Sequence, residues 1–141
     1  MKIIVGSDHG GVHLKGKIVA RLLALGHEVD DIGTFDEGSV DYPVFALQVA
    51  QAVASHRLDR GILICGSGIG MTICANKVAG VRASLCCDAE AARTTREHND
   101  SNVLCLSGDR TSVEDAVRFA EIYLGAQFTG GRHARRVGFL R

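Results

Sequence analysis

The stretch Gly61-Ile62-Leu63-Ile64-Cys65-Gly66-Ser67-Gly68-Ile69-Gly70 decides the fold of this chain. Its first four residues form a continuous apolar run, which is typical of a strand that is buried on both faces of a parallel sheet. Closely spaced glycines follow, and the segment 71–76 continues as a short helix. A buried strand, a glycine-rich turn and a helix together indicate an α/β protein.

The rest of the chain alternates between strand and helix patterns around this unit. The patterns predict further strands at 2–5, 27–32, 81–85 and 103–106, and further helices at 12–25, 44–54, 89–97 and 113–124. This alternation predicts a Rossmann-like αβα sandwich with a five-stranded parallel sheet and helices on both faces. Because no linker or repeat divides the chain, we expect residues 1–141 to form a single domain.

The composition argues against several classes of protein. Lysine plus arginine (16) balances aspartate plus glutamate (16), so net charge does not favour binding to nucleic acid or to a membrane surface. The start of the chain lacks a signal-peptide pattern, and no apolar run reaches the ~18 residues of a membrane span. The five cysteines include no C-x-x-C pair, which is typical of reduced thiols rather than of a disulfide or zinc framework. We therefore expect a cytoplasmic protein.

Polar residues follow three of the predicted strands. Asp8 and His9 come after the first strand, the segment 65–70 after the third, and Asp88 after the fourth. Ligands of such folds bind at the carboxyl ends of the strands, so we expect these residues to meet at one edge of the sheet. The alternative for Asp8 is that it only caps the next helix.

The glycine-rich turn 66–70 is suited to an anion, because glycine lets backbone amides approach a phosphate, a carboxylate or an enediolate closely. It lacks the Gly-Lys-Ser/Thr of a P-loop, and the alternative is a tight turn without a ligand. Cys65 precedes this turn, where a thiolate could serve as a nucleophile or a general base. The alternative is a buried apolar residue, which is the interpretation given to the other cysteines: Cys74, Cys86, Cys87 and Cys105.

Histidines and arginines outside this turn are the remaining candidates. His98 could transfer protons near neutral pH, although on its own it is better interpreted as a partner of a helix C-terminus. His9 and His13 have the spacing of a helical metal pair, but no third ligand is evident, so we do not expect a metal site. Arg132 and Arg136 would share one face of a helix and could clamp a phosphate, unless the basic tail is simply solvated.

Motifs along nearly the whole chain occur in an order that is specific as a set. They are Val5-Gly6-Ser7-Asp8-His9-Gly10-Gly11, Asp41-Tyr42-Pro43, the stretch 61–70, Ala75-Asn76-Lys77, Arg82-Ala83, His98-Asn99-Asp100, Leu124-Gly125-Ala126-Gln127-Phe128, Gly130-Gly131-Arg132-His133 and Arg136-Val137. In this order they resemble the ribose-5-phosphate isomerase B family, which also includes galactose-6-phosphate and allose-6-phosphate isomerases.

The resemblance implies an aldose–ketose isomerase without cofactor or metal. The implied reaction interconverts D-ribose 5-phosphate and D-ribulose 5-phosphate through an enediolate, as in the non-oxidative pentose phosphate pathway. The resemblance also implies a homodimer, in some cases paired into a tetramer, whose active site is shared between two subunits. A six-carbon sugar phosphate is the alternative substrate, and a non-catalytic phosphosugar-binding module is the alternative function.

The resemblance assigns catalytic roles residue by residue. Cys65 matches the base that moves a proton between sugar C1 and C2, and Ser67 matches the residue that shuttles protons between O1 and O2. Some relatives use a glutamate on the far side of the loop instead, but Met71 follows Gly70 here, so the cysteine version applies. The loop amides, including those of Gly66, Gly68 and Gly70, would hold the enediolate, and His98 matches the histidine that opens the sugar ring.

Substrate-binding roles follow in the same way. Asn99 and Asp8 match residues that bind sugar hydroxyls. The phosphate-binding set matches His9, Arg132 and Arg136, so that the basic tail 130–141 completes the phosphate site. In the family a short segment after the fifth strand ends in a ligand-binding arginine. Here Leu106-Ser107-Gly108-Asp109-Arg110 is one residue longer and places an acidic residue beside Arg110, the matching position.

Overall fold

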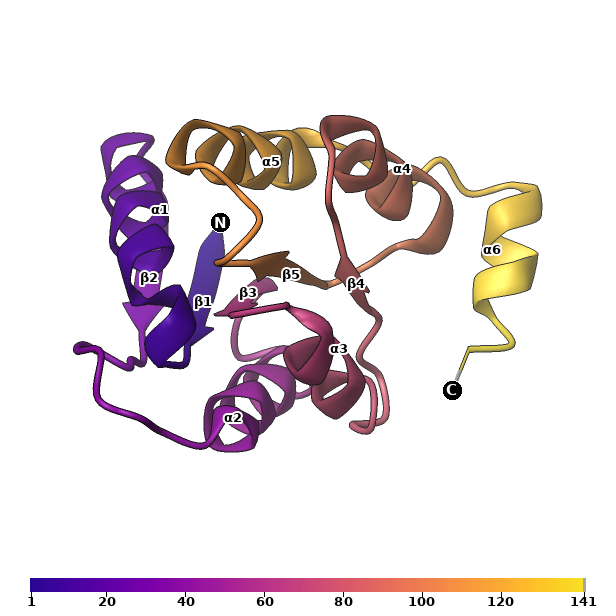
Figure 1. Cartoon of the computed structure of the whole chain (residues 1–141). Coiled ribbons are helices and arrows are strands. Elements are labelled where there is room, and N and C mark those ends of the chain that lie inside the picture. The colour runs from indigo at the N-terminus through magenta and orange to yellow at the C-terminus, as the bar shows by residue number, and fades with distance from the viewer. Residues whose placement is uncertain (141) are drawn as a thin grey trace.

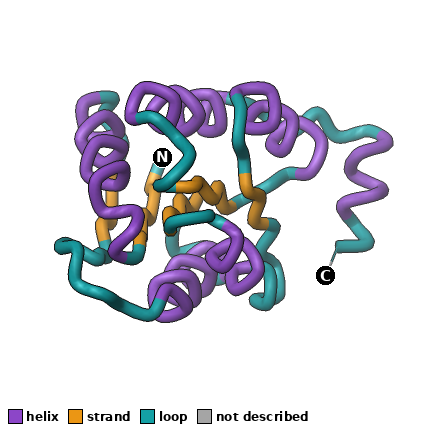
Figure 2. The backbone as a smooth tube through the Cα atoms, in the orientation of Figure 1, coloured by secondary structure: helices purple, strands orange, loops and turns teal. Residues whose placement is uncertain are grey.

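The computed structural model describes residues 1–140, which form one sheet with helices on either side (Figures 1 and 2). In chain order the elements are β1 (Lys2–Ser7), the 3-10 turn η1 (His9–Gly11), α1 (Val12–Ala24), β2 (Glu28–Asp31), α2 (Tyr42–Ala54), β3 (Arg60–Cys65), α3 (Ile69–Ala75), β4 (Ala83–Leu85), α4 (Ala89–Asn99), β5 (Val103–Ser107), α5 (Val113–Gly125) and α6 (Arg132–Val137). The α/β fold with five strands is therefore confirmed.

All strand pairs are parallel, and the strand order is β2-β1-β3-β5-β4. The last strand in the chain, β5, thus lies between β3 and β4, and β4 is the outermost strand on that side of the sheet. Burial explains this placement, because every residue of β5 is buried whereas those of β4 are only half-buried. The predicted fourth strand was too long at its start, since the amide of Arg82 bonds to the Asn102 side chain instead of entering the ladder.

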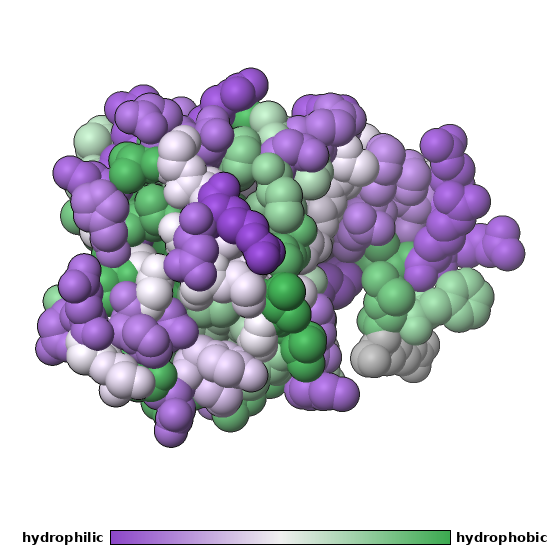
Figure 3. All heavy atoms as spheres, viewed as in Figure 1, coloured by the Kyte–Doolittle hydropathy of each residue, from purple (hydrophilic) through white to green (hydrophobic). Residues whose placement is uncertain are grey.

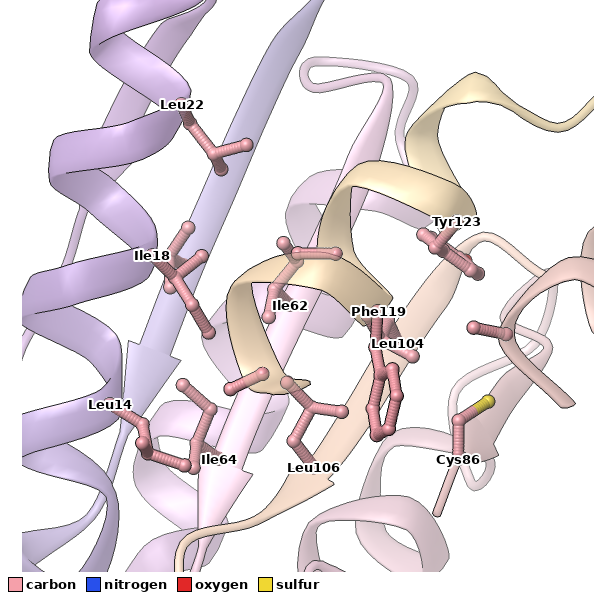
Figure 4. Packing of buried hydrophobic residues seen from close by; sticks show 14 of the residues in the cluster. Leu14, Ile18, Leu22, Ile62, Ile64, Cys86, Leu104, Leu106, Phe119 and Tyr123 are labelled. Atoms are coloured by element: carbon pink, nitrogen blue, oxygen red, sulfur yellow. The ribbon is translucent and has the colours of Figure 1, made fainter. Parts of the chain in front are cut away.

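Side chains of the central strands alternate between two hydrophobic cores. Ile62 and Ile64 contribute to the core beneath α1, α4 and α5, whereas Leu63 and Cys65 contribute to the core beneath α2 and α3. Figure 4 shows the first core, where Leu14 and Ile18 of α1 face the strands beside Phe119 and Tyr123 of α5. This alternation follows from the two-residue period of a strand, and it points Cys65 toward α2 and α3.

The helices begin and end where local chemistry directs them. Pro43 lies in the first turn of α2, Asp88 caps α4 by accepting from the Ala91 amide at 2.7 Å, and Ser112 caps α5 by accepting from the Asp115 amide at 3.1 Å. Gly26, at φ +88°, follows α1 as the C-terminal glycine expected there. Within residues 1–140, the structure contains no helix that is both long enough and apolar enough to span a bilayer.

The end of the chain stands apart from the sandwich. Helix α6 packs against α4 alone among the larger contacts and buries none of its residues (Figure 1). Figure 3 shows a recess between this segment and the body of the molecule, with hydrophobic surface at the chain end beyond it. Phe139 is 78% exposed and Leu140 is 55% exposed there. Single exposed apolar residues are common on protein surfaces, and here two lie together on a projecting segment.

We predict that Ile64→Ala, at the centre of the sheet, lowers the free energy of unfolding by about 2–5 kcal/mol, and that Ile64→Val lowers it by about 0.5–1.5 kcal/mol. The side chain is fully buried, so the first change leaves a cavity and the second only a small one. Urea denaturation followed by circular dichroism measures both values. Leu23→Ala, at a 55% exposed position on α1, is the control and should change stability by less than about 0.5 kcal/mol. Equal losses for Ile64 and Leu23 variants would contradict this account of the core.

Candidate functional site

The loop after β3 places a backbone amide against the sulfur of Cys65. Cys65 is the last residue of β3 and is only 4% exposed, and the Gly68 amide donates a hydrogen bond to its Sγ at 3.1 Å. The Ile69 amide donates to the hydroxyl of Ser67 at 3.1 Å. The loop therefore provides a hydrogen-bond donor to the sulfur, an arrangement that suits a thiolate base.

Gly68 is the residue that this loop requires to be glycine. Its φ is +78°, and a Cβ built there would lie 2.5 Å from Leu85 Cδ1 and 3.0 Å from the backbone of Leu106. Any side chain would be strained and would collide with β4 and β5. The loop is therefore a tight turn, which directs the Gly68 amide at Cys65 Sγ.

The turn after β5 fixes the loop from outside. The Gly108 and Asp109 amides donate to the carbonyls of Cys65 and Gly66 at 2.8 and 3.0 Å, and Ser107 Oγ donates to the Gly66 carbonyl at 2.7 Å. The extra acidic residue noted in the sequence is Asp109, whose amide is part of this support. Arg110 lies in the same turn with an exposed side chain, so its role toward a ligand stays a prediction.

The end of β1 joins the same edge, as expected from the strand pattern. The Asp8 amide donates to the Ile64 carbonyl at 3.2 Å, and its carboxylate accepts from the Gly10 amide at 2.9 Å. Asp8 therefore does cap the following turn, and it lies, 7% exposed, beside the Cys65 loop. Asp88, by contrast, is an exposed helix cap.

His9 faces the segment that precedes α2. Its Nδ1 accepts from the Val40 amide at 3.3 Å. A neutral ring that accepts at Nδ1 carries its proton on Nε2, which can then donate to a phosphate oxygen. Among residues 1–140 no group of three or more His, Cys, Asp or Glu side chains is arranged to hold a metal ion, and the prediction that none is needed stays a prediction.

Tyr42 also belongs to this edge, although it was not among the candidate site residues. A Cβ built at Gly70 would lie 2.6 Å from Cζ of the Tyr42 ring, so the ring lies directly over the glycine loop. In the sequence, Tyr42 stands in the motif Asp41-Tyr42-Pro43. This motif contributes to the family resemblance but does not by itself predict that Tyr42 lies at the site.

His98 and Asn99 lie at the opposite edge of the sheet. Helix α4 leaves the carboxyl end of β4 and runs back to the amino end of β5, so its last residues lie where the strands begin. Asn102 confirms this position, because its carbonyl accepts from Gly61 at the start of β3. Since β5 has five residues at ~3.3 Å each, the sheet separates His98 from Cys65 by more than about 13 Å. One chain does not bring the three candidate catalytic residues together.

A second cluster surrounds His98. Its ring stacks on that of His133, with centroids 4.2 Å apart and planes 8° from parallel. A pocket of about 340 Å³ is lined there by His98, Asn99, His133, Arg136, Val137 and Leu140. Arg132 and Arg136 are both exposed on α6, so residues 132–137 of the tail are helical, as the spacing of these two arginines suggested.

His133 was also missed as a candidate, although it stands in the motif Gly130-Gly131-Arg132-His133. Its pKa is lowered from the usual 6.5 by desolvation and, after that, by the nearby positive groups His98, Arg132 and Arg136. The neutral form is therefore favoured, and a neutral ring can stack on His98 without repulsion.

The other cysteines differ from Cys65 in their surroundings. Burial raises the pKa of Cys86 and of Cys105 to about 12, and it also raises the pKa of Cys74. These three thiols therefore behave as apolar residues, as expected. Cys87 is the exception, because it is exposed in the turn after β4 rather than inside a strand. All five cysteines are unpaired.

Comparison with known proteins gives this geometry a context. A ribose-5-phosphate isomerase B from Escherichia coli is 48% identical over 136 residues, 96% of this chain and 91% of the relative. The structure of a ribose-5-phosphate isomerase B from Clostridium thermocellum matches with a TM-score of 0.96 and 51% identity over 98% of this chain and 93% of that one. The same enzyme from Mycoplasma genitalium, solved with bound ribulose 5-phosphate, matches with a TM-score of 0.93 and 40% identity over 96% and 91%. The family model described as ribose/galactose isomerase matches residues 3–140, and this chain therefore belongs to that family.

Proposed function

We propose that this protein interconverts D-ribose 5-phosphate and D-ribulose 5-phosphate through an enediolate intermediate, as a step of the non-oxidative pentose phosphate pathway. The observation that carries the proposal is the hydrogen bond from the Gly68 amide to Cys65 Sγ, within a glycine-rich loop at the edge where Asp8 and His9 also lie. The named relatives, one with ribulose 5-phosphate bound, support the same activity.

In the proposed mechanism the open-chain aldose is held with C2 near Cys65. The thiolate removes the C2 proton, and the electron pair moves so that C1 and C2 share a double bond and O1 carries the negative charge. The amides of the 66–70 loop stabilise this oxyanion, and Ser67 moves a proton between O2 and O1. Return of the proton from Cys65 to C1 gives the ketose.

His98 opens the sugar ring before this step, and the basic groups hold the phosphate. An imidazole suits ring opening because it can give and accept protons near neutral pH. Asp8 and Asn99 bind sugar hydroxyls, His9, Arg132 and Arg136 contact the phosphate, and Arg110 helps to bind the ligand. Binding energy from a phosphate far from C1 keeps the reacting carbons in position.

We propose that a second copy of the chain completes the site. His98 and Cys65 lie at opposite edges of one sheet, so a shared site requires the His98 cluster of one subunit to meet the Cys65 loop of the other. Exposed apolar side chains flank that loop, namely Ile69, Ile73, Val44 and Leu47 on α3 and α2. Together with Phe139 and Leu140 they offer apolar surface on both sides of such a contact. We propose a homodimer, which could pair into a tetramer, located in the cytoplasm.

We predict that the purified protein converts ribose 5-phosphate to ribulose 5-phosphate with a chelator present, and that Cys65→Ala lowers kcat by at least about 10³-fold, because the base is lost. A coupled assay of ribulose 5-phosphate formation measures both, and Cys87→Ala, which changes an exposed thiol after β4, is the matched control.

Higher kcat/KM on allose 6-phosphate or galactose 6-phosphate would shift the assignment to a six-carbon substrate. No turnover on any of the three would favour the non-catalytic binding module. Full activity of Cys65→Ala would keep the reaction and remove Cys65 from its assigned role.

We predict that two inactive variants restore each other. A mixture of Cys65→Ala and His98→Asn subunits, unfolded and refolded together, should recover about a quarter of the wild-type activity, because half of the dimers are mixed and each has one intact site. The two variants refolded separately are the controls. A mixture no more active than its components would show that each site lies within one chain.

We predict that the docking of α6 onto α4 weakens as the pH falls below about 6.5. The pKa of His133 is lower in the folded chain than in the unfolded one, so the unfolded chain binds the proton first and the stacked form loses stability as pH decreases. Amide hydrogen exchange of residues 132–137 at pH 7.5 and 5.5, corrected for intrinsic rates, measures this effect. His133→Phe keeps a stacking ring without titrating and should remove the pH dependence. Equal protection at both pH values in the wild type would refute the role of the stack.

A further inference from the structure

Lys15 is a buried charge that the reaction does not use. It lies on α1 with only 2% of its surface exposed. Its Nζ is 2.6 Å from Asp31 Oδ1 and 4.5 Å from the centroid of the Phe35 ring. A buried ammonium is costly unless it is paired, so its presence here calls for a reason beyond the packing of α1.

The partner carboxylate is at the end of β2. The same oxygen, Asp31 Oδ1, also accepts from the Gly33 amide at 3.1 Å. The chain then runs beside Ser7, whose amide donates to the Gly33 carbonyl at 2.7 Å and whose carbonyl accepts from the Thr34 amide at 2.8 Å. Asp31 Oδ1 therefore connects Lys15 of α1 to Gly33, the first residue of the segment 33–41. This part of the segment pairs with Ser7, which directly precedes Asp8.

The segment 33–41 leads from this attachment to the substrate edge. Near its end the Val40 amide donates to His9, and the next helix begins with Tyr42 over Gly70. Between these points the residues 35–39 are exposed, and Phe35 is 70% exposed. Burial therefore contributes little to the placement of Phe35, whose ring makes a cation–π contact with Lys15 and lies beside Gly33.

We propose that Lys15 is a positioning residue, which holds the segment 33–41 through Asp31 and Phe35 and thereby keeps His9 and Tyr42 in place for the sugar phosphate. This inference rests on the proposed function for the identity of the ligand. The contacts of Lys15 with Asp31 and Phe35 do not depend on it.

The two contacts of Lys15 allow its positioning role to be separated from stability. Lys15→Met removes both contacts and leaves Asp31 without its cation, so it should lower the melting temperature as well as affect substrate binding. Phe35→Leu removes only the contact with the exposed ring, so it should affect the segment and spare the core. Lys15→Arg keeps the positive charge and should restore binding in part.

The experiment measures kcat, KM for ribose 5-phosphate and melting temperature for these variants. We expect Phe35→Leu to raise KM about tenfold and to change kcat less than about threefold. The phosphate contacts stabilise the ground state and the transition state equally, so weakening them raises KM and leaves kcat nearly unchanged. Its melting temperature should stay within about 2 °C of the wild type, since surface substitutions change stability little. Lys17→Met, on the exposed side of the same helix, is the matched control and should resemble the wild type.

Unchanged KM in Phe35→Leu, together with a Lys15→Met variant that loses only melting temperature, would overturn the proposal and leave Lys15 a purely structural residue. Amide hydrogen exchange of residues 34–41 provides a second readout, which should become faster in Phe35→Leu and in Lys15→Met than in Lys17→Met. If the wild type did not turn over ribose 5-phosphate, the proposed function would fail, and the exchange rates would still decide whether Lys15 holds the segment. Equal exchange in all variants would refute that hold.

Discussion

The site depends first on the parallel pairing of β1 with β3. This pairing sets Ser7 opposite Ile64, so that the next residue of each strand, Asp8 and Cys65, emerges at the same edge. The chain connections then leave in opposite directions along the sheet, since β1 is followed by β2 on one side of the pair and β3 is followed by β4 on the other. A crevice forms where the connections of two neighbouring strands leave in opposite directions. Open α/β sheets bind their ligands in this crevice. Gly11 shows how close the approach is, because a Cβ built on it would lie 2.6 Å from the Ile64 carbonyl oxygen.

The same parallel arrangement forces the separation of the two clusters. A helix that connects parallel strands must run back along the sheet, so a residue at its end lies at the edge opposite the strand ends. His98, at the end of α4, follows this rule. The Arg96 and Arg82 side chains both bond to Asp100, which lies in the left-handed region at φ 48°, and they fix that end of the helix firmly. Movement of His98 toward Cys65 within one chain would break these contacts, which supports the proposal that a second subunit unites the clusters.

Most of the fold could be predicted from the sequence, because its signals are local. Apolar runs marked β1, β3 and β5, and glycine, proline and aspartate marked the ends of helices. The order of strands is not local, although the contrast between Val103-Leu104-Cys105-Leu106 and the short, partly polar β4 indicates which strand is inside. The part of the site at the carboxyl ends of the strands was predictable for the same reason, because Asp8 and His9 come directly after β1 and Cys65 ends β3. The distance between His98 and Cys65, the ring of Tyr42 over Gly70 and the His98–His133 stack each depend on contacts between distant segments, and no spacing in the sequence encodes them.

The charges of α6 connect phosphate binding to the state of the histidine stack. The chain as a whole is neutral, yet Arg132, Arg135 and Arg136 lie on one exposed helix without an acidic residue in its first turn. Such a local excess of positive charge attracts a phosphate dianion, and it also disfavours protonation of His133. Under the proposed function, the same positive charge would hold the phosphate beside the stack, where Arg136 and both histidines line one pocket.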